Sequence, residues 1–326
     1  MLDLAVPRAH LGGMESGVPI LVVTGETASG KERLAVAVAR QVGGEIVSAD
    51  SMKVYRGMDV GTAKASAEER RAVPHHLIDV ADPGETFSTA RWLDLAEAAV
   101  ADVAGRGRVP IVSGGTALYL KALLEGLFEG PAADAALRDR LKAEAKSHGT
   151  LALHARLVEV DAAAASRIHP NDLRRIIRAL EVWELTGSPI SELQTQWGSD
   201  RPQYRPLLVA IRRSGADLDR RIAERVGRMA KAGLLDEVRR LAERPEGLAM
   251  GPGQAVGYAE VLDHLAGRLT WQETLDAIAL HTRQFAKRQR TWLRRFRGLV
   301  WLDAPAEAPA DRVAALWREH AAADRA

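Results

Sequence analysis

The hydrophobic pattern of the chain has two periods. Short runs rich in Val, Ile and Leu are bounded by glycine, proline or polar residues, as is typical of buried strands. These runs occupy residues 20–24, 45–49, 77–80, 109–112, 207–211 and 298–302. Between them, apolar residues recur every three or four positions and predict helices, for example over 31–42 and over 89–104 with Ser88 as N-cap. The alternation predicts an α/β fold with a parallel sheet flanked by helices.

Residues 130–201 follow a different pattern. After Gly130 and Pro131 the spacing is helical and no run predicts a strand. One helix is predicted from about Asp172 to Leu185 and is ended by Gly187. Its apolar stripe comprises Leu173, Ile176, Ile177, Leu180 and Trp183. We therefore predict an all-α insertion over 130–201, between two parts of the α/β core at 18–129 and 202–304. The termini, 1–17 and 305–326, are predicted to be loose, apart from a short helix over 311–320.

The segment 281–297 combines an apolar stripe with a basic one. Phe285, Gln289, Trp292 and Phe296 recur at helical spacing and predict the inward face of a helix. The cations on the opposite side are Arg283, Lys287, Arg290, Arg294 and Arg297, with Arg288 and Arg295 in addition. A solvated surface is the usual interpretation of such a stripe. Since the segment contains no acidic residue, a polyanionic partner such as nucleic acid explains it better.

The composition excludes several classes of protein. The 326 residues are 47% hydrophobic and 27% charged, which is ordinary for a globular protein with a large core. No apolar run approaches the roughly 20 residues of a membrane span, and the N-terminus does not resemble a signal peptide. The sequence has no cysteine, so disulfides and thiolate metal sites are excluded. We predict a cytoplasmic protein without membrane association. The net charge of +2 by itself says little about partners.

The most specific chemical motif is a phosphate cradle between the first predicted strand and the helix that follows it. The spacing G-x-x-x-x-G-K runs from Gly25 to Lys31. The backbone N–H groups of residues 27–31 can converge on an anion, and the helix N-terminus adds positive partial charge. Lys31 adds a full charge that can reach the outer phosphate. The motif therefore predicts a site for a di- or triphosphate.

The residue after this lysine departs from the motif. Ser or Thr at this place ligates Mg²⁺ through its hydroxyl, whereas this chain has Glu32. A carboxylate can also bind Mg²⁺, but Glu32 brings negative charge close to a phosphate, as does Glu26. Three interpretations follow: the metal is held differently, phosphate binding is weakened, or the site has been altered.

Two further strand ends carry candidate site residues. Asp50 and Ser51 follow the strand at 45–49, and ligands of open α/β sheets bind outside the carboxyl ends of the strands. Asp50 can therefore face the cradle, or it can cap a turn. The strand at 109–112 leads into Ser113, Gly114, Gly115 and Thr116. Two glycines permit close approach of a bulky ligand, or they form a tight turn before the next helix.

Taken together, these features resemble the bacterial tRNA dimethylallyltransferases, also called tRNA isopentenyltransferases. The matching stretches are 25–31, 48–51, 54–64, 113–119, 168–181, 254–258 and 282–293. The resemblance implies a P-loop NTPase-like core with a helical insertion. It also implies transfer of the dimethylallyl group of dimethylallyl diphosphate to the exocyclic amine of the adenosine 3′ of the anticodon. A P-loop small-molecule kinase or ATPase would explain the cradle and the acid, but not the insertion and the basic helix.

The resemblance further implies roles for individual residues. Asp50 matches the general base, and Thr116 is expected to be a second catalytic residue. Arg221 matches an arginine that contacts the diphosphate, with Arg225 as second choice. Mg²⁺ would be the cofactor, with Glu32 in place of the usual hydroxyl ligand. The diphosphate would be bound by Gly25, Thr27, Ala28, Ser29, Gly30, Lys31 and Arg221. The anticodon stem-loop of tRNA would be contacted by Asp50, Ser51, Met52, Lys53, Thr116, Arg138, Leu173, Arg174, Arg175, Ile176, Ile177, Gln254, Gly257, Lys287, Arg288, Gln289, Arg290 and Arg294. A monomer is expected.

Two residues depart from the pattern of this family. Glu26 stands where the family usually has proline, and Glu32 stands where it has Ser or Thr. Because of Glu32, a tRNA-binding protein with impaired catalysis is an alternative. A transferase that prenylates free adenine nucleotides is another, although such an enzyme would not need the basic helix.

Overall fold

The computed structural model describes residues 17–128, 130–194, 201–305 and 309–322. The chain forms two compact units. Unit 1 contains the residues up to Leu124 and those from Arg201 onwards, and unit 2 spans Glu125–Asp200. The observed division lies five residues before the predicted start of the insertion and one residue before its predicted end. The predicted loose terminus at 1–17 falls almost wholly outside the described residues.

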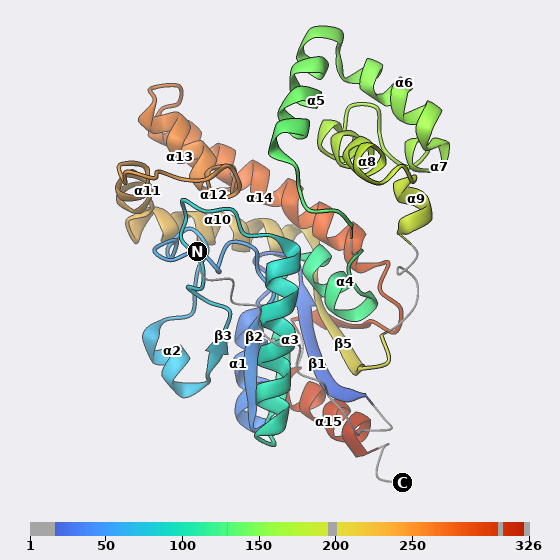
Figure 1. Ribbon diagram of the computed structural model, residues 1–326. Coiled ribbons are helices and arrows are strands. Elements are labelled where there is room, and N and C mark those ends of the chain that lie inside the picture. Colours follow the sequence, from blue (N-terminus) through green and yellow to red (C-terminus); the bar gives the residue numbers. More distant parts are fainter. Residues whose placement is uncertain (1–16, 129, 195–200, 306–308, 323–326) are drawn as a thin grey trace. The chain divides into compact units, whose positions relative to one another are not determined.

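Unit 1 is built on a six-stranded parallel sheet in the order β3-β2-β4-β1-β5-β6. Figure 1 labels β3, β2, β1 and β5 of this sheet. Its strands are β1 (Val18–Gly25), β2 (Gly44–Ser48), β3 (His75–His76), β4 (Val109–Ser113), β5 (Tyr204–Arg213) and β6 (Val300–Ala304). β1 lies in the interior of the sheet between β4 and β5, where its near-continuous apolar run is buried on both faces. The predicted parallel α/β fold is confirmed.

The helices of unit 1 surround this sheet. They are α1 (Lys31–Val42), α2 (Ala67–Ala72), α3 (Thr89–Gly105), α4 (Ala117–Glu125), α10 (Gly215–Lys231), α11 (Leu234–Ala242), α12 (Met250–Gly253), α13 (Tyr258–Leu265), α14 (Trp271–Leu293) and α15 (Pro309–Ala322). Leu34 and Val38 of α1 pack with Val313 and Trp317 of α15 in one apolar core. The helix predicted at the C-terminus is therefore confirmed, and the prediction of a loose end is wrong for α15.

The strand predicted at 77–80 is also wrong. The strand ends at His76, and both Leu77 and Asp79 have positive φ angles, of 62° and 59°. That conformation is incompatible with a strand. The Asp79 carboxylate instead accepts hydrogen bonds from Lys64 at 2.6 Å and Arg70 at 2.8 Å. Polar contacts with a distant loop thus outweigh the apolar pattern.

Unit 2 consists of helices within its described residues, as predicted. They are α5 (Ala135–His148), α6 (Thr150–Val160), α7 (Ala162–Ala165), α8 (Leu173–Thr186) and α9 (Ile190–Leu193). Asp172 caps α8 at its start, and Gly187 ends it with a φ of 70°. Of the predicted apolar stripe, Ile176, Ile177 and Leu180 are buried in the unit's own core.

Helix α14 buries a different face from the predicted one. Its buried residues are Thr274, Ile278, Thr282, Ala286, Gln289 and Leu293, whereas Phe285 is 38% exposed. Short side chains such as Thr282 and Ala286 let a helix approach its neighbours closely, and α14 packs against α10 and α13. The helix ends at Leu293, so the cations from Arg294 onwards lie beyond its last turn. In the part of the chain that the structure describes, no helix is long and apolar enough to cross a membrane.

Candidate active site

The cradle has the geometry of an anion site. β1 ends at Gly25, α1 begins at Lys31, and Gly30 between them has a φ of 98°. Within the described residues, the backbone N–H groups of Ala28, Gly30 and Lys31 have no protein acceptor. The Ser29 hydroxyl is buried and equally lacks a partner among these residues. Buried donors normally have partners, so the loop is suited to hold the oxygens of an anion.

Positive charge surrounds this loop. Lys31 is buried and donates from Nζ to the carbonyl of Glu26 at 3.3 Å. Burial lowers the pKa of its ammonium, and the neighbouring Glu32 carboxylate counteracts that effect. Arg221 donates to the Ala28 carbonyl at 2.7 Å, and Arg225 to the Thr27 hydroxyl at 3.2 Å. The structure thus brings both predicted arginines to the cradle.

Arg213 is a further cation at the cradle that the sequence did not reveal. Its Nε donates to the Ser29 carbonyl at 2.6 Å. A Cβ built on Gly30 would lie 3.5 Å from Arg221 Nη2 and 3.6 Å from Arg213 Nη2. Both guanidinium groups therefore end beside the turn that precedes α1. Arg213 is the last residue of β5, and β5 lies next to β1 in the sheet. Arg213 therefore reaches the cradle because of the strand order, which no local sequence pattern reveals.

One predicted donor of the cradle is already used by the protein. The Thr27 N–H donates to Gln289 Oε1 at 2.7 Å, and Gln289 Nε2 donates to the Gly115 carbonyl at 2.8 Å. A Cβ on Gly115 would lie 2.3 Å from Gln289 Nε2, and one on Gly114 only 2.1 Å from the Ala49 carbonyl oxygen. The two glycines therefore make room for the protein's own atoms, which agrees with the alternative interpretation of a tight turn.

Asp50 lies at the carboxyl end of β2, as predicted. Its Oδ1 accepts hydrogen bonds from the backbone N–H groups of Met52 at 2.9 Å and Lys53 at 3.3 Å. Within the described residues Oδ2 accepts none, and the side chain is half-buried. The Asp50 carboxylate also lies close enough to Lys31 and Arg225 to raise the pKa of each, against the burial that lowers both. Asp50 thus caps a turn with one oxygen and keeps the other free beside the cradle.

Thr116 supports the same turn from the start of α4. Its hydroxyl oxygen accepts a hydrogen bond from the Ser51 N–H at 3.0 Å, and its own N–H donates to the Ala49 carbonyl at 3.1 Å. The loops that follow β2 and β4 are therefore joined beside the cradle. Asp50, Ser51, Met52 and Thr116 come together there, as predicted.

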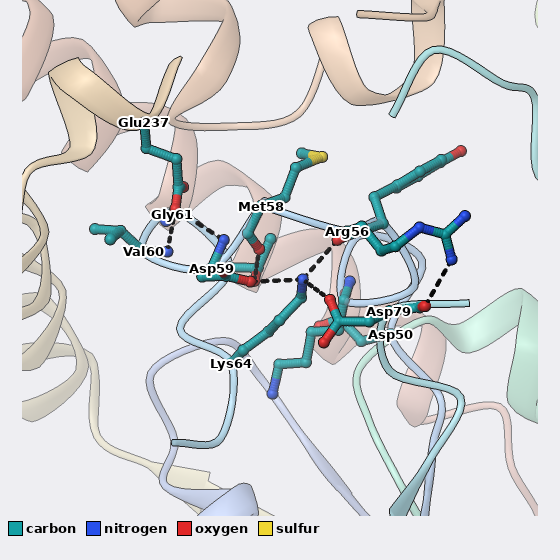
Figure 2. Close-up of polar contacts among 12 residues, drawn as sticks. Asp50, Arg56, Met58, Asp59, Val60, Gly61, Lys64, Asp79 and Glu237 are labelled. Atoms are coloured by element: carbon teal, nitrogen blue, oxygen red, sulfur yellow. Dashed lines mark hydrogen bonds and ion pairs between the residues drawn. The ribbon is translucent and has the colours of Figure 1, made fainter. Parts of the chain in front are cut away.

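The loop between Tyr55 and Lys64 is held by a residue that the sequence analysis missed. The buried carboxylate of Glu237 on α11 accepts hydrogen bonds from the backbone N–H groups of Asp59, Val60 and Gly61 at 2.8–3.0 Å (Figure 2). It also accepts one from the Tyr258 hydroxyl at 2.7 Å. An acidic residue inside the apolar stripe of Leu234, Val238 and Leu241 is the signal that could have revealed it.

A second anchor of this loop is Lys64. Its ammonium lies between the carboxylates of Asp59, at 2.8 Å, and Asp79, at 2.6 Å (Figure 2). Only 2% of the Lys64 side chain is exposed. Arg225 connects the loop to the cradle, because its second nitrogen donates to the Thr62 carbonyl at 3.5 Å. Buried polar groups thus hold this loop in addition to its buried apolar residues Tyr55 and Met58.

Both unusual carboxylates of the cradle have cationic partners. Glu26 is fully buried and pairs with two nitrogens of Arg290, with Nη2 at 2.8 Å from its Oε2. Glu32, 37% exposed, has Oε1 3.3 Å from Nζ of Lys53, a side chain only 6% exposed. Neither carboxylate is therefore left as an uncompensated charge against an anion. Arg290 and Lys53 therefore each pair with a carboxylate of the cradle.

Comparison with known proteins bears on this site directly. The IPP transferase family model matches residues 53–296, and the isopentenyl transferase model matches residues 18–81. The chain is 52% identical to a tRNA dimethylallyltransferase of Symbiobacterium thermophilum, over 88% of this chain and 89% of that protein. The chain belongs to the tRNA dimethylallyltransferase family. It is therefore a prenyltransferase by descent, and the resemblance noted in the sequence is confirmed.

Other members of the family agree. The tRNA dimethylallyltransferase of Anaeromyxobacter dehalogenans is 51% identical over 88% of this chain and 95% of its own. The crystal structure of the tRNA isopentenylpyrophosphate transferase of Bacillus halodurans superposes with a TM-score of 0.69 at 37% identity, covering 95% of this chain and 99% of that one. A eukaryotic dimethylallyltransferase described as acting on tRNA superposes with a TM-score of 0.77 at 27% identity, covering 91% of this chain and 78% of that one. The P-loop NTPase-like core is confirmed.

The residues expected to contact tRNA in this family differ in their exposure. Lys287, Arg288, Arg294, Arg174, Arg175 and Gln254 are exposed, whereas Gln289, Gly257, Ile176, Ile177 and Lys53 are buried. Arg138 pairs with the buried carboxylate of Glu181 through two bonds, of 2.7 and 2.8 Å. Leu173 is half-buried at the start of α8. The exposed set can meet a polyanion directly, whereas Ile176 and Ile177 pack in the core of unit 2 and Lys53 and Gln289 bond to other residues of unit 1.

Proposed function

We propose that the chain transfers the dimethylallyl group from dimethylallyl diphosphate to the exocyclic amine of the adenosine immediately 3′ of the anticodon of tRNA, and releases diphosphate. The observation that carries the proposal is that the phosphate cradle and the Asp50 carboxylate lie side by side at the carboxyl ends of the strands. The cradle N–H groups, which have no acceptor within the described residues, would form a diphosphate site together with Lys31, and the Asp50 carboxylate lies beside them. Membership of the family supplies the reaction class.

The residues present suit each step of this reaction. An exocyclic adenine amine is a weak nucleophile, and Asp50 would accept its proton as the amine attacks the allylic carbon. The carbon–oxygen bond to the diphosphate breaks, and negative charge grows on the leaving group. Lys31, the cradle N–H groups and Arg221 would stabilise that charge. Thr116 would keep Asp50 in place through the turn that it supports.

The donor set also fits Mg²⁺. Within the described residues no three acidic or histidine side chains converge on one point. Mg²⁺ in phosphate sites is bound by one or two carboxylates together with substrate oxygens and water. Glu32 would hold the ion, since its carboxylate is half-exposed at the rim of the cradle and lies beside Lys31. When bound, the ion would neutralise charge on the leaving diphosphate.

The anticodon stem-loop would meet exposed cations of α14, of the residue that follows it, and of α8. Lys287, Arg288 and Arg294 lie on unit 1, and Arg174 and Arg175 on unit 2. Such contacts follow phosphates and give binding a strong dependence on salt. The adenosine has to leave its stack before its amine can reach a donor in the cradle. We infer that the enzyme acts in the cytoplasm, where it meets tRNA, and as a monomer.

The decisive experiment combines labelled dimethylallyl diphosphate with an unmodified tRNA transcript and digests the product to nucleosides. We expect label in a single modified adenosine, and none when that adenosine is replaced by guanosine. Label on free adenine nucleotides, or nucleotide hydrolysis without tRNA, would instead identify one of the alternative enzymes. Binding of the transcript without transfer, at any Mg²⁺ concentration, would indicate a tRNA-binding protein that has lost catalysis.

A further inference from the structure

The basic helix α14 meets the phosphate cradle through two consecutive side chains. Arg290 pairs with Glu26, the second residue of the cradle. Gln289 accepts from the Thr27 N–H at 2.7 Å and donates to the Gly115 carbonyl at 2.8 Å. One turn of one helix therefore binds both loops that border the anion site.

Arg290 is set apart from the other cations of its helix. Lys287 and Arg288 are exposed, whereas the Arg290 side chain is only 29% exposed and its partner Glu26 is fully buried. The same guanidinium donates to the Arg213 carbonyl at 3.3 Å. A planar guanidinium matches a carboxylate with two parallel hydrogen bonds. A cation held in this way is not available to a polyanion at the surface.

Glu26 in turn holds the lysine of the cradle. Lys31 Nζ donates to the Glu26 carbonyl at 3.3 Å, and the Ser29 N–H donates to the same oxygen at 3.1 Å. Since the carbonyl and the carboxylate belong to one residue of a tight turn, fixing the side chain restricts the carbonyl too. Without Arg290, a buried carboxylate would remain uncompensated in the loop that has to receive an anion.

We propose that Arg290 is a positioning residue for the donor site. It neutralises Glu26, so that the cradle stays suited to a diphosphate, and it holds the Glu26 carbonyl against Lys31. The inference rests on the proposed function only in taking the donor to be a diphosphate. It assigns Arg290 to the donor site, although Arg290 lies within a stripe of cations that the sequence predicts to contact tRNA.

The test measures binding of inorganic diphosphate by calorimetry and binding of tRNA across a salt series. Arg290→Gln should weaken diphosphate binding by at least about tenfold, because the buried Glu26 charge then opposes the ligand. Its tRNA affinity and salt slope should match those of the parent protein. Glu26→Gln/Arg290→Gln should recover most of the diphosphate affinity, since the opposing charge is gone. Arg288→Gln, the contrasting variant, should keep diphosphate binding and lower the salt slope by about one unit.

Several results would overturn this assignment. Diphosphate binding by Arg290→Gln equal to that of the parent protein, an equally weak double variant, or a salt slope lowered as in Arg288→Gln would each reject it. If Arg290→Gln does not fold, diphosphate binding by Glu26→Gln tests the assignment instead. It should bind diphosphate at least as tightly as the parent, and a tenfold loss would show that the carboxylate itself serves binding. A parent protein that binds no diphosphate would instead reject the proposed function.

Discussion

At the scale of single residues, three carboxylates near the cradle differ because their partners differ. Asp50 uses one oxygen for a turn and keeps the other free. Glu26 is buried and fully paired by Arg290, and Glu32 is half-exposed and paired by Lys53. The same functional group thus serves as candidate base, as structural anion and as candidate metal ligand. Burial and the nearest cation decide which role each can fill.

Asp50 offers the sharpest test of mechanism. Asp50→Ala should slow the chemical step by about 10²–10⁴-fold and leave diphosphate binding largely intact, because a general base contributes about that much. Asp50→Asn is the matched variant, since its amide oxygen can still accept from Met52 and Lys53. Single-turnover rates of both variants should be similarly low. A rate near that of the parent for Asp50→Asn would leave Asp50 only as a turn cap.

Glu32→Thr tests how much the second unusual carboxylate matters. Removing it should tighten diphosphate binding at limiting Mg²⁺, with a smaller gain at high Mg²⁺, because an anion close to the donor is lost. It should also lower the melting temperature by about 2–4 °C, because Lys53 is buried and loses its partner, at a cost of about 1 kcal/mol.

Calorimetry across a Mg²⁺ series and thermal melts check both effects of Glu32→Thr. Adding Lys53→Gln to Glu32→Thr should restore the melting temperature, because no buried ammonium is then left unpaired. If Glu32→Thr binds diphosphate more weakly at every Mg²⁺ concentration, including the lowest, the repulsion argument fails and Glu32 acts only as a metal ligand.

At the scale of elements, α14 has two functions on two faces. Its inner side carries Thr282, Ala286 and Gln289 against the core, and Arg290 reaches the cradle from the same helix. Its outer side carries exposed cations. Helix α11 likewise holds a loop through a single side chain, since the buried carboxylate of Glu237 accepts hydrogen bonds from three backbone N–H groups. Side chains of helices thus hold the backbone of loops that border the cradle.

The outer face of α14 should determine the salt dependence of tRNA binding. A variant with Lys287, Arg288 and Arg294 changed to Ala should lose affinity, and its salt slope should fall by about two to three units, since each lost phosphate contact removes slightly less than one. Filter binding across a salt series measures this slope. Arg318→Ala is the control, because Arg318 borders a surface hollow with Val42, at the end of α1 away from the cradle. An unchanged slope in the triple variant would mean that the stripe is only a solvated face.

At the scale of the whole molecule, the insertion leaves unit 1 and returns to it at neighbouring points. The Arg201 N–H donates to the Leu124 carbonyl at 3.0 Å, and Arg201 also pairs with Glu97. The cradle, Asp50, Thr116 and the arginines of α10 all belong to unit 1. Unit 2 has a separate apolar core formed by its own helices. The residues proposed for the donor chemistry and the core of the insertion therefore belong to separate units.

Removing unit 2 tests that separation. A chain in which residues 125–200 are replaced by a short glycine-serine linker should still fold, because the two ends are already hydrogen-bonded neighbours. We expect it to bind diphosphate with an affinity close to that of the parent and to lose most of its affinity for tRNA. Calorimetry and filter binding on the two proteins check both expectations. Loss of diphosphate binding in a folded variant would show that unit 2 contributes to the donor site.

The sequence by itself determined the features that depend on local pattern. Five of the six predicted strands, the cradle between β1 and α1, the place of Asp50 and the all-α insertion follow from period, glycine position and caps, which act over a few residues. The tertiary structure alone decided the contacts between distant residues. Glu26 and Arg290 are 264 positions apart, and Lys53 meets Glu32 across two separate segments. Because the pairing of a charge and the buried face of α14 depend on what packs opposite, no local pattern could assign them.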